Sequence, residues 1–247
     1  MRQTFTTIIG KSVRKLAQAR GGGSALPGLF VEKIDPDFIK RTLADLPRGI
    51  VLISGTNGKT TTTKMVVELL EGQGLKVFTN RTGSNFTRGV AAALLGEVDV
   101  KGKLDADIAV LELDEAHAVH FVRAIPPTYS LLLNVMRDQL DRFGEIDKTA
   151  ALLHTIATAT TDGVVINRDD PRLAAEKFLR DITATTASFS VAPKLQSLFP
   201  SDDAMRGTVD NSKGAIVRAD NTSLELIEGQ HATIKFAGHA HKTELKL

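Results

Sequence analysis

One segment, residues 49–70, constrains the fold of this chain more than any other. It begins with four apolar residues, Ile50 to Ile53, bounded on both sides by turn formers. A short β-branched run of this kind predicts a buried strand. The sequence Gly55-Thr56-Asn57-Gly58-Lys59-Thr60-Thr61 follows, and apolar side chains then recur at helical spacing as far as residue 70. The segment therefore predicts a strand, a glycine-containing loop and a helix, in that order.

A loop of this composition is typical of a phosphate-binding site. Glycines let backbone N–H groups approach phosphate oxygens, and the N-terminus of a helix adds a positive dipole. Lys59 supplies a charge, and the hydroxyl of Thr60 can hold Mg²⁺. The motif is the shorter form G-T-x-G-K-[ST], because Ile53 stands where the longer P-loop pattern has glycine. An ordinary strand-to-helix turn is the alternative, but the flanking elements favour nucleotide binding by residues 55–61.

The rest of the chain repeats the alternation of strand and helix. Strands are expected at 76–79, 108–113, 130–135 and 164–167, and helices at 86–95, 116–125, 147–160 and 172–179. This alternation predicts an α/β fold, in which a mostly parallel, P-loop-containing sheet is flanked by helices. Ligands of such sheets bind beyond the carboxyl ends of the strands. The loops at Ser54, Asn80, Glu112, Asn134 and Asn167 are therefore expected to converge.

The two ends of the chain differ from this central part, which we expect at 49–190. Residues 1–48 are expected to form a helical segment. Its first twenty residues predict a basic amphipathic helix, which either docks on the protein or contacts a membrane surface, and a turn is expected at Leu26-Pro27-Gly28. Residues 191–247 alternate apolar and polar side chains between turn signals, which predicts a small antiparallel meander. Its strands are expected at 215–218, 223–227, 232–236 and 243–247.

Acidic and amide side chains follow the predicted strands. Glu112 ends a buried strand near the expected position of Thr60, where a carboxylate can complete a Mg²⁺ shell. Asp114 and Glu115 come next, and one of them can instead cap the following helix. Asp170 precedes Pro171, so this segment either serves function or simply starts a helix.

A second charged cluster lies at a strand end. Asp138, Asp141 and Arg142 belong to the stretch from Asn134 to Glu145. These three side chains can form a surface ion network, which contributes little to stability. Alternatively they ligate a second metal ion or orient a substrate phosphate. The sequence leaves both alternatives open.

Composition and missing motifs exclude several classes. The formal net charge is +2, so there is no electrostatic argument for a nucleic-acid partner. The absence of cysteine excludes disulfides and thiolate metal sites, and the six scattered histidines do not suggest a zinc site, so no zinc is expected. The chain has no G-x-S-x-G elbow, no G-x-G-x-x-G fingerprint and no Asn-Lys-x-Asp guanine motif. A serine hydrolase, a nicotinamide enzyme and a GTPase are therefore disfavoured.

The order of these motifs resembles one family, the Mur ligases together with the folylpolyglutamate synthases, which are ATP-dependent amide-bond ligases. The resemblance rests on Gly55 to Thr61, the acid Glu112, the run Asn134…Asp138-x-x-Asp141-Arg142 and the run Asn167-x-Asp169-Asp170-Pro171. Within the family, the chain is most similar to the MurT-type branch of lipid II isoglutaminyl synthase. That branch shares Leu26-Pro27-Gly28, Asp114-Glu115-Ala116 and the stretch Arg137 to Glu145.

The resemblance implies an activity. ATP and Mg²⁺ would activate the α-carboxyl of D-glutamate in the stem peptide of lipid II, and ammonia would attack the acyl phosphate to give D-isoglutamine. A class I glutamine amidotransferase-like glutaminase subunit, of the GatD type, would supply the ammonia. The implied location is the cytoplasm, with at most peripheral contact with the inner face of the membrane.

The resemblance also assigns residues by role. Those implied in catalysis are Lys59, Glu112, Asp138 and Asp141. Those implied in ATP binding are residues 55–61 together with Asn167 and Asp170, and Thr60 and Glu112 would hold Mg²⁺. Those implied in substrate binding are Thr82, Gly83, Ser84, Asn85, Asn134 and Arg142.

Some residues depart from the family pattern. Most Mur ligases have histidine at the position of Gln139 and a carbamoylated lysine near His154, so both departures agree with the MurT-like branch. A conventional amino-acid ligase and a non-catalytic ATP-binding module are the alternatives. The family continues beyond residue 247 with a further domain, so we expect this chain to be an N-terminal fragment that does not ligate by itself.

Overall fold

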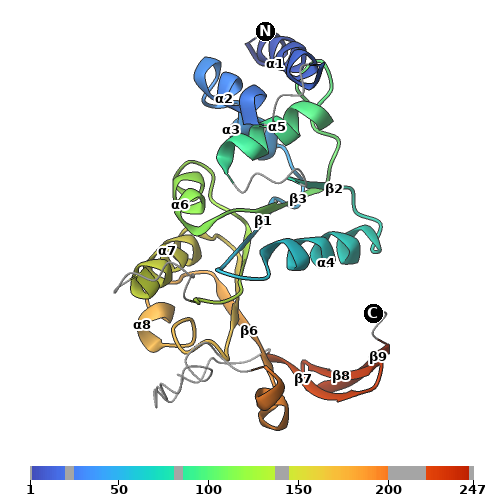
Figure 1. Ribbon diagram of the computed structural model, residues 1–247, viewed down its shortest axis with the longest axis vertical. Helices are drawn as coiled ribbons and strands as arrows, with labels where there is room; N and C mark the ends of the chain where they lie inside the picture. The colour runs from blue at the N-terminus through green and yellow to red at the C-terminus, as the bar shows by residue number, and fades with distance from the viewer. Residues whose placement is uncertain (1, 20–24, 81–85, 137–144, 200–220, 245–247) are drawn as a thin grey trace.

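The computed structural model describes residues 2–19, 25–80, 86–136, 145–199 and 221–244. In this part of the chain, strands form a sheet with the order β2-β3-β1-β4-β5-β6-β7-β8-β9 (Figure 1). The strands are β1 Ile50–Ser54, β2 Val77–Thr79, β3 Ile108–Glu112, β4 Tyr129–Leu132, β5 Gly163–Asn167, β6 Thr185–Val191, β7 Asn221–Glu228, β8 His231–Phe236 and β9 His239–Glu244.

Helices cover both faces of the parallel part of the sheet. They are α1 Arg2–Ala19, α2 Ala25–Ile34, α3 Phe38–Ala44, α4 Lys59–Glu71, α5 Thr87–Glu97, α6 Glu115–Ala124, α7 Glu145–Ala159, α8 Glu176–Leu179 and the 3₁₀ helix η1 Pro193–Leu198. Helix α4 lies on one face, and α6 and α7 lie on the other (Figure 1). The predicted α/β fold, with a mostly parallel sheet flanked by helices, is confirmed.

Strand β1 lies inside the parallel sheet, between β3 and β4. Ile53 is in register with Glu112 of β3 and with Leu131 of β4, and both pairings are parallel. Apolar side chains fill both faces, because a strand covered on both sides must be apolar throughout. Leu52 belongs to the large cluster under α5, α6 and α7, whereas Ile53 packs in a smaller cluster with Val67 of α4.

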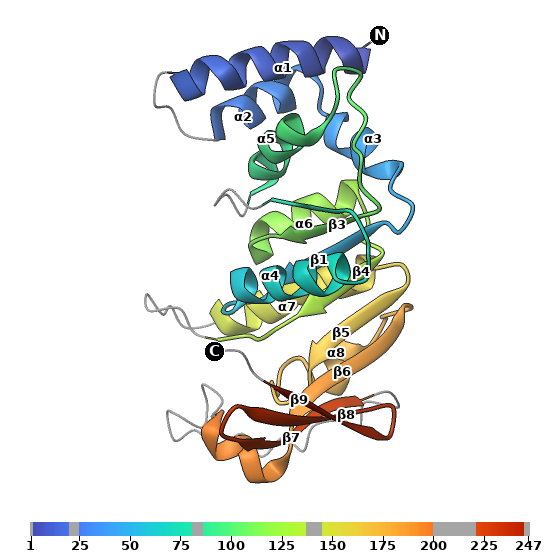
Figure 2. The ribbon, with the colours of Figure 1, turned by 90° about the vertical axis from the view of Figure 1, so that its right-hand side faces the viewer.

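The N-terminal helices pack against α5 at one end of the molecule (Figure 2). The predicted turn at Leu26-Pro27-Gly28 is wrong, because these residues lie in the first turn of α2. Proline is compatible with the first turn of a helix, where its missing N–H needs no partner. A Cβ atom at Gly28 would lie 2.0 Å from the carbonyl oxygen of Arg88, so glycine permits the close approach of α2 to α5.

The segment after β5 differs from the prediction. The helix expected at 172–179 is only the short helix α8, because turns precede it. The following strand, β6, was not predicted. It pairs in parallel with both β5 and β7, so one sheet continues from the central part into the C-terminal strands.

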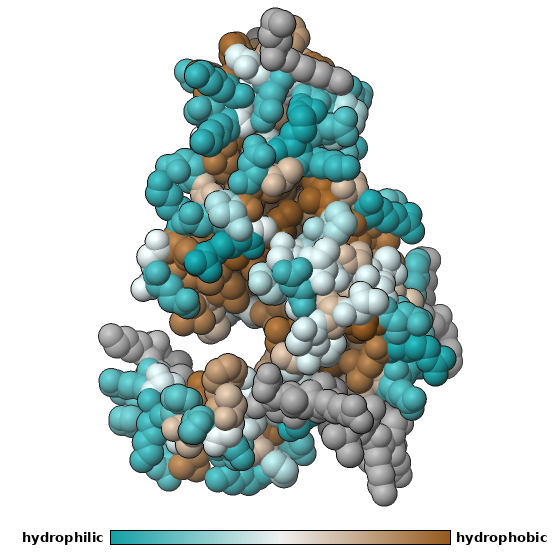
Figure 3. Space-filling view, turned by 180° about the vertical axis from the view of Figure 1, so that it is seen from behind, coloured by the Kyte–Doolittle hydropathy of each residue, from teal (hydrophilic) through white to brown (hydrophobic). Residues whose placement is uncertain are grey.

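Strands β7, β8 and β9 form the predicted antiparallel meander. The last strand begins at His239, rather than at residue 243. The strand expected at 215–218 lies outside the described residues. These strands project beyond the body of the protein, and a hollow separates them from it on one side (Figure 3). Among the helices that the structure describes, none is both long and apolar enough to cross a membrane.

Candidate nucleotide-binding site

The loop between β1 and α4 has the backbone conformation that its two glycines permit. Gly55 has φ of 137° and Gly58, the N-cap of α4, has φ of 83°, values that side chains with a Cβ rarely adopt. A Cβ atom at Gly55 would also lie 3.0 Å from the backbone nitrogen of Asn134. The glycines therefore serve two purposes, a left-handed backbone at the start of α4 and close contact with the loop after β4.

Lys59 lies over this loop. Its Nζ donates hydrogen bonds to the carbonyl oxygens of Gly55, at 2.5 Å, and Thr56, at 3.1 Å. Because Lys59 is also the first residue of α4, its ammonium adds to the positive end of the helix dipole. The loop, the helix N-terminus and the ammonium together make a site suited to phosphate.

Thr60 and Glu112 meet at the carboxyl ends of β1 and β3. The Thr60 hydroxyl donates to Glu112 Oε1 at 2.8 Å, and the Glu112 residue is buried. Asn80, which follows β2, holds the backbone of Glu112 on both sides. Its Nδ2 donates to the Glu112 carbonyl at 2.8 Å, and its Oδ1 accepts from the Glu112 N–H at 2.9 Å. Asn80 thus fixes the backbone of Glu112, while Thr60 contacts one carboxylate oxygen.

The Thr60 and Glu112 oxygens fit a magnesium ion that accompanies a nucleotide. Mg²⁺ prefers oxygen ligands, and in nucleotide sites it keeps several waters beside one or two protein groups and the phosphates. A hydroxyl and a carboxylate 2.8 Å apart, next to a phosphate-binding loop, supply such a pair. That Glu112 is a metal ligand stays a prediction. The described residues contain no group of three or more His, Cys, Asp or Glu side chains placed to hold a metal.

Asn134, which follows β4, forms hydrogen bonds with the loop between β1 and α4. The N–H of Asn57 donates to its Oδ1 at 2.9 Å, and its Nδ2 donates to the Asn57 carbonyl at 3.0 Å. The N–H of Thr56 also donates to the Asn134 carbonyl, at 3.1 Å. Both ends of the amide are therefore engaged by the phosphate-binding loop. The predicted contact between Asn134 and substrate is untested.

Asp170 connects the loop after β5 to the end of β4. Its Oδ2 accepts from the N–H of Val135 at 2.6 Å, and its Oδ1 accepts from those of Arg172, at 2.9 Å, and Leu173, at 3.2 Å. Burial raises the pKa of the Asp170 carboxyl, and these three backbone donors oppose that shift. The hydrogen bonds from the N–H groups of Arg172 and Leu173 to the Asp170 side chain account for the turns that precede α8. Contact of Asp170 or Asn167 with nucleotide stays a prediction.

Sequence reasoning did not assign Glu115 a part in the site. Asp114 is the N-cap of α6, and its carboxylate accepts from the N–H of Ala116 at 3.1 Å. The next residue, Glu115, is buried, and burial raises the pKa of its carboxyl, against the opposing charge of Lys59. The sequence Glu112-Leu113-Asp114-Glu115 does not indicate which carboxylate caps the helix and which one is buried.

The loops at Ser54, Asn80, Glu112, Asn134 and Asn167 do come together, as expected. Ser54 also takes part, since its hydroxyl donates to the carbonyl of Leu113 at 2.9 Å. Several predicted residues lie outside the described residues: Thr82, Gly83, Ser84, Asn85, Asp138, Gln139, Asp141 and Arg142. His154 lies on α7, where its Nε2 is 2.9 Å from the carbonyl oxygen of Arg180.

A parallel sheet that carries this loop, with a Thr–Glu pair at its carboxyl edge, defines an α/β protein of the P-loop class. Comparison with known families is more specific. The family model described as the Mur ligase middle domain matches residues 53–239, which is most of the chain. The chain therefore belongs to the Mur ligase family.

Two relatives are similar in sequence. The MurT subunit of lipid II isoglutaminyl synthase (glutamine-hydrolyzing) from Staphylococcus aureus (strain COL) is 35% identical over 185 residues, which are 73% of this chain and 40% of that protein. The MurT subunit from Streptococcus pneumoniae is 35% identical over 172 residues, which are 69% of this chain and 38% of that protein. The chain thus spans about 40% of the length of these curated relatives.

Solved structures show the same fold. The MurF ligase from Thermotoga maritima, in complex with ADP, has a TM-score of 0.61 and 18% sequence identity, and the match covers 88% of this chain and 44% of that one. At this identity the likeness concerns the fold alone.

Proposed function

We propose that this chain is the nucleotide-binding part of an ATP-dependent carbon–nitrogen ligase of peptidoglycan biosynthesis. The observation that carries the proposal is that three features lie together at the carboxyl edge of the sheet. They are the loop from Gly55 to Thr61, the Lys59 ammonium above it and the hydrogen bond between Thr60 and Glu112. Membership of the Mur ligase family supports the reaction class, since ligase is part of the family's name.

The chain's own residues bind and orient the triphosphate. Backbone N–H groups of the loop and the N-terminus of α4 contact phosphate oxygens, and Lys59 moves from the loop carbonyls to the phosphates. Asn134 and Asp170 keep the loop and the end of β4 in place. Thr60 and Glu112 would hold Mg²⁺, which neutralises phosphate charge when it is bound.

The proposed reaction is amidation of the D-glutamate α-carboxyl in the lipid II stem peptide. Transfer of the γ-phosphoryl group of ATP to the carboxylate gives an acyl phosphate and ADP. Ammonia then attacks the carbonyl carbon, phosphate leaves, and a proton is lost from nitrogen, which gives D-isoglutamine. The names of the two MurT relatives support this choice of substrate and of a glutamine-hydrolysing partner. A conventional ligase would instead take an amino acid as the acceptor.

Nucleotide binding is tested with Lys59→Ala, and Lys64→Ala is the control because Lys64 is an exposed lysine on the same helix. Isothermal titration of the 247-residue chain with Mg-ATP is expected to show binding for the wild type and for Lys64→Ala. For Lys59→Ala we expect a loss of affinity of roughly tenfold to a hundredfold, because a charge-assisted contact to phosphate is removed. Unchanged affinity in Lys59→Ala would sink the proposal.

A second experiment tests the acceptor. The proposed function requires that ammonia, and not an amino acid, attacks the activated carboxyl. Lipid II and Mg-ATP are incubated with the chain and either ammonium chloride or a mixture of amino acids, and the stem peptide is examined by mass spectrometry. Isoglutamine formed with ammonium chloride would support the proposed reaction, whereas an amino-acid adduct would favour the conventional ligase.

A further inference from the structure

Helices α1 and α2 lie at the end of the molecule opposite β7–β9 (Figures 1 and 2), and several of their large apolar side chains are exposed. We define the α1–α2 face by Phe5, Ile8 and Leu16 of α1 and Leu26 and Phe30 of α2. These side chains are between 37% and 61% exposed. Single exposed apolar residues are ordinary, whereas five large ones on two helices that contact each other make this part of the surface unusually apolar.

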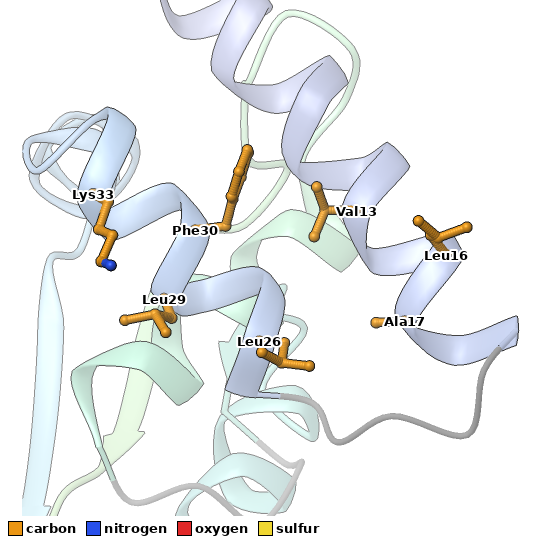
Figure 4. A pocket seen from close by; sticks show the side chains of 7 residues that line it. All are labelled: Val13, Leu16, Ala17, Leu26, Leu29, Phe30 and Lys33. Atoms are coloured by element: carbon orange, nitrogen blue, oxygen red, sulfur yellow. The ribbon is translucent and has the colours of Figure 1, made fainter.

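Three residues of this face, Leu16, Leu26 and Phe30, also line a groove between the helices. The groove encloses a cavity of about 350 Å³, and its lining is almost entirely apolar. Leu16 and Ala17 line it from α1, and Leu26 and Phe30 line it from α2, while Lys33 lies at its edge (Figure 4). A groove of this size and lining accepts part of a hydrocarbon chain but offers no polar partner to a hydrophilic ligand.

The exposed charges beside the α1–α2 face are mainly positive. Helix α1 contains no Asp or Glu, and Lys15 is exposed beside Leu16, as Lys33 is beside the groove. The acid on α2, Glu32, is 2.9 Å from the guanidinium of Arg88 and is thereby compensated. Apolar side chains flanked by cations match the boundary between anionic lipid head groups and acyl chains. Two such faces meeting in a dimer would bring like charges together.

We propose that the α1–α2 face docks this protein on an anionic phospholipid bilayer. Phe5, Ile8 and Leu16 enter the boundary between head groups and acyl chains, and part of one acyl chain enters the groove. Lys15 and Lys33 contact anionic head groups. Docking would bring the protein close to a lipid-linked substrate, and this consequence rests on the proposed function. The docking itself does not, because the helices, the groove and the charges are separate from the nucleotide site.

The test is co-sedimentation of the 247-residue chain with vesicles. One set contains phosphatidylglycerol and phosphatidylcholine in equal parts, and the other contains phosphatidylcholine alone. The apolar variant carries Phe5→Ser and Ile8→Ser, and the charge variant carries Lys15→Glu and Lys33→Glu. The control carries Met65→Ser and Leu69→Ser, which replace two exposed apolar residues of α4.

We expect the wild type and the α4 control to sediment with the anionic vesicles and to bind phosphatidylcholine roughly tenfold more weakly. Each α1–α2 variant should lose roughly tenfold or more of its binding to the anionic vesicles, while circular dichroism shows an unchanged helix content. Lys59→Ala should bind vesicles like the wild type, which separates this proposal from that of nucleotide binding.

Three results would overturn the proposal. One is equal vesicle binding by the wild type and the apolar variant. Another is equal binding to charged and neutral vesicles. The third is a dimer, detected by light scattering without lipid, that the apolar variant abolishes, because the face would then be the interface between two copies.

Discussion

At the scale of single residues, the contact between Thr60 and Glu112 predicts a metal-dependent phenotype. Glu112→Gln keeps the shape of the side chain, and Asn80 still holds the backbone of residue 112, so the fold should survive. We expect the affinity for Mg-ATP to fall roughly tenfold to a hundredfold, as is typical when metal coordination is disturbed. Titration with ATP in the presence of Mg²⁺ and then of EDTA measures this. Glu97→Gln, at an exposed end of α5, is the control, and a full response to Mg²⁺ in Glu112→Gln would exclude the metal role.

Asp170 predicts how stability depends on pH. Burial raises the pKa of its carboxyl above the ordinary value of 3.8, so the folded state binds this proton more tightly than the unfolded state does. This contribution to stability is complete below pH 3.8, and it is lost as the pH rises through the raised pKa of the folded state. The wild type should therefore show a component of stability that decreases over that window, and thermal melts of Asp170→Asn should lack it.

The same substitution has a second effect at neutral pH. An asparagine has one acceptor oxygen, whereas both oxygens of Asp170 accept backbone N–H groups, so the amide nitrogen would face a donor. We expect Asp170→Asn to destabilise the protein by about 1–3 kcal/mol in spite of the relieved desolvation. Urea unfolding measures this, with Asp162→Asn, at an exposed position, as the control. A more stable Asp170→Asn at neutral pH would show that burial of the charge outweighs the hydrogen bonds.

These residues also show the limit of sequence reasoning at a site. The loop from Gly55 to Thr61 was predicted because its chemistry is contiguous in the chain. The contacts of Asn80 with Glu112 and of Asp170 with Val135 join residues 32 and 35 positions apart. Such pairs depend on which strands become neighbours, and the sequence carries no local signal for that.

At the scale of elements, the close contact between α2 and α5 predicts that one methyl group added at Gly28 lowers the stability of the fold. In Gly28→Ala the new Cβ would meet the backbone carbonyl of Arg88, which cannot move without shifting α5. We expect a loss of about 1–3 kcal/mol, typical of overpacking, in chemical unfolding.

Gly96→Ala is the matched control for this contact. A Cβ atom there would meet only the guanidinium of Arg14, at the far end of a flexible side chain. Alanine also favours a helix over glycine, so this variant should be neutral or slightly stabilised. If both variants lost the same free energy of unfolding, the loss would come from replacing a glycine within a helix and not from the close approach of α2 to α5.

The strands that were predicted and the strand that was missed differ in their pattern of apolar and polar residues. Strands β1 and β3 are short runs that are apolar up to their last residue, and both were predicted. Strand β6 has the sequence Thr-Thr-Ala-Ser-Phe-Ser-Val, in which small and polar residues dominate, and it becomes a strand because β5 and β7 pair with it on both sides. Tertiary pairing of this kind overrides local preference.

At the scale of the whole molecule, the two ends of the sheet should differ in stability. Strands β1 and β3 are covered by helices and are almost wholly buried, whereas every described residue of β9 is exposed and β8 has one buried residue, Ala232. Local opening costs least where few apolar contacts are lost. The meander β7–β9 should therefore open without global unfolding.

Hydrogen exchange tests this difference directly. Under native conditions, amides of β8 and β9 should exchange at least about a hundredfold faster than those of β1 and β3, because opening the meander leaves the central core intact. Added denaturant should affect exchange in β1 and β3 strongly and exchange in β9 weakly, since global unfolding exposes far more surface than local opening. Mg-ATP should slow exchange in β1 and α4 but leave β9 unchanged, because the proposed nucleotide site does not include the meander. Equal protection of both regions, with the same response to denaturant, would mean that the sheet unfolds as one cooperative unit.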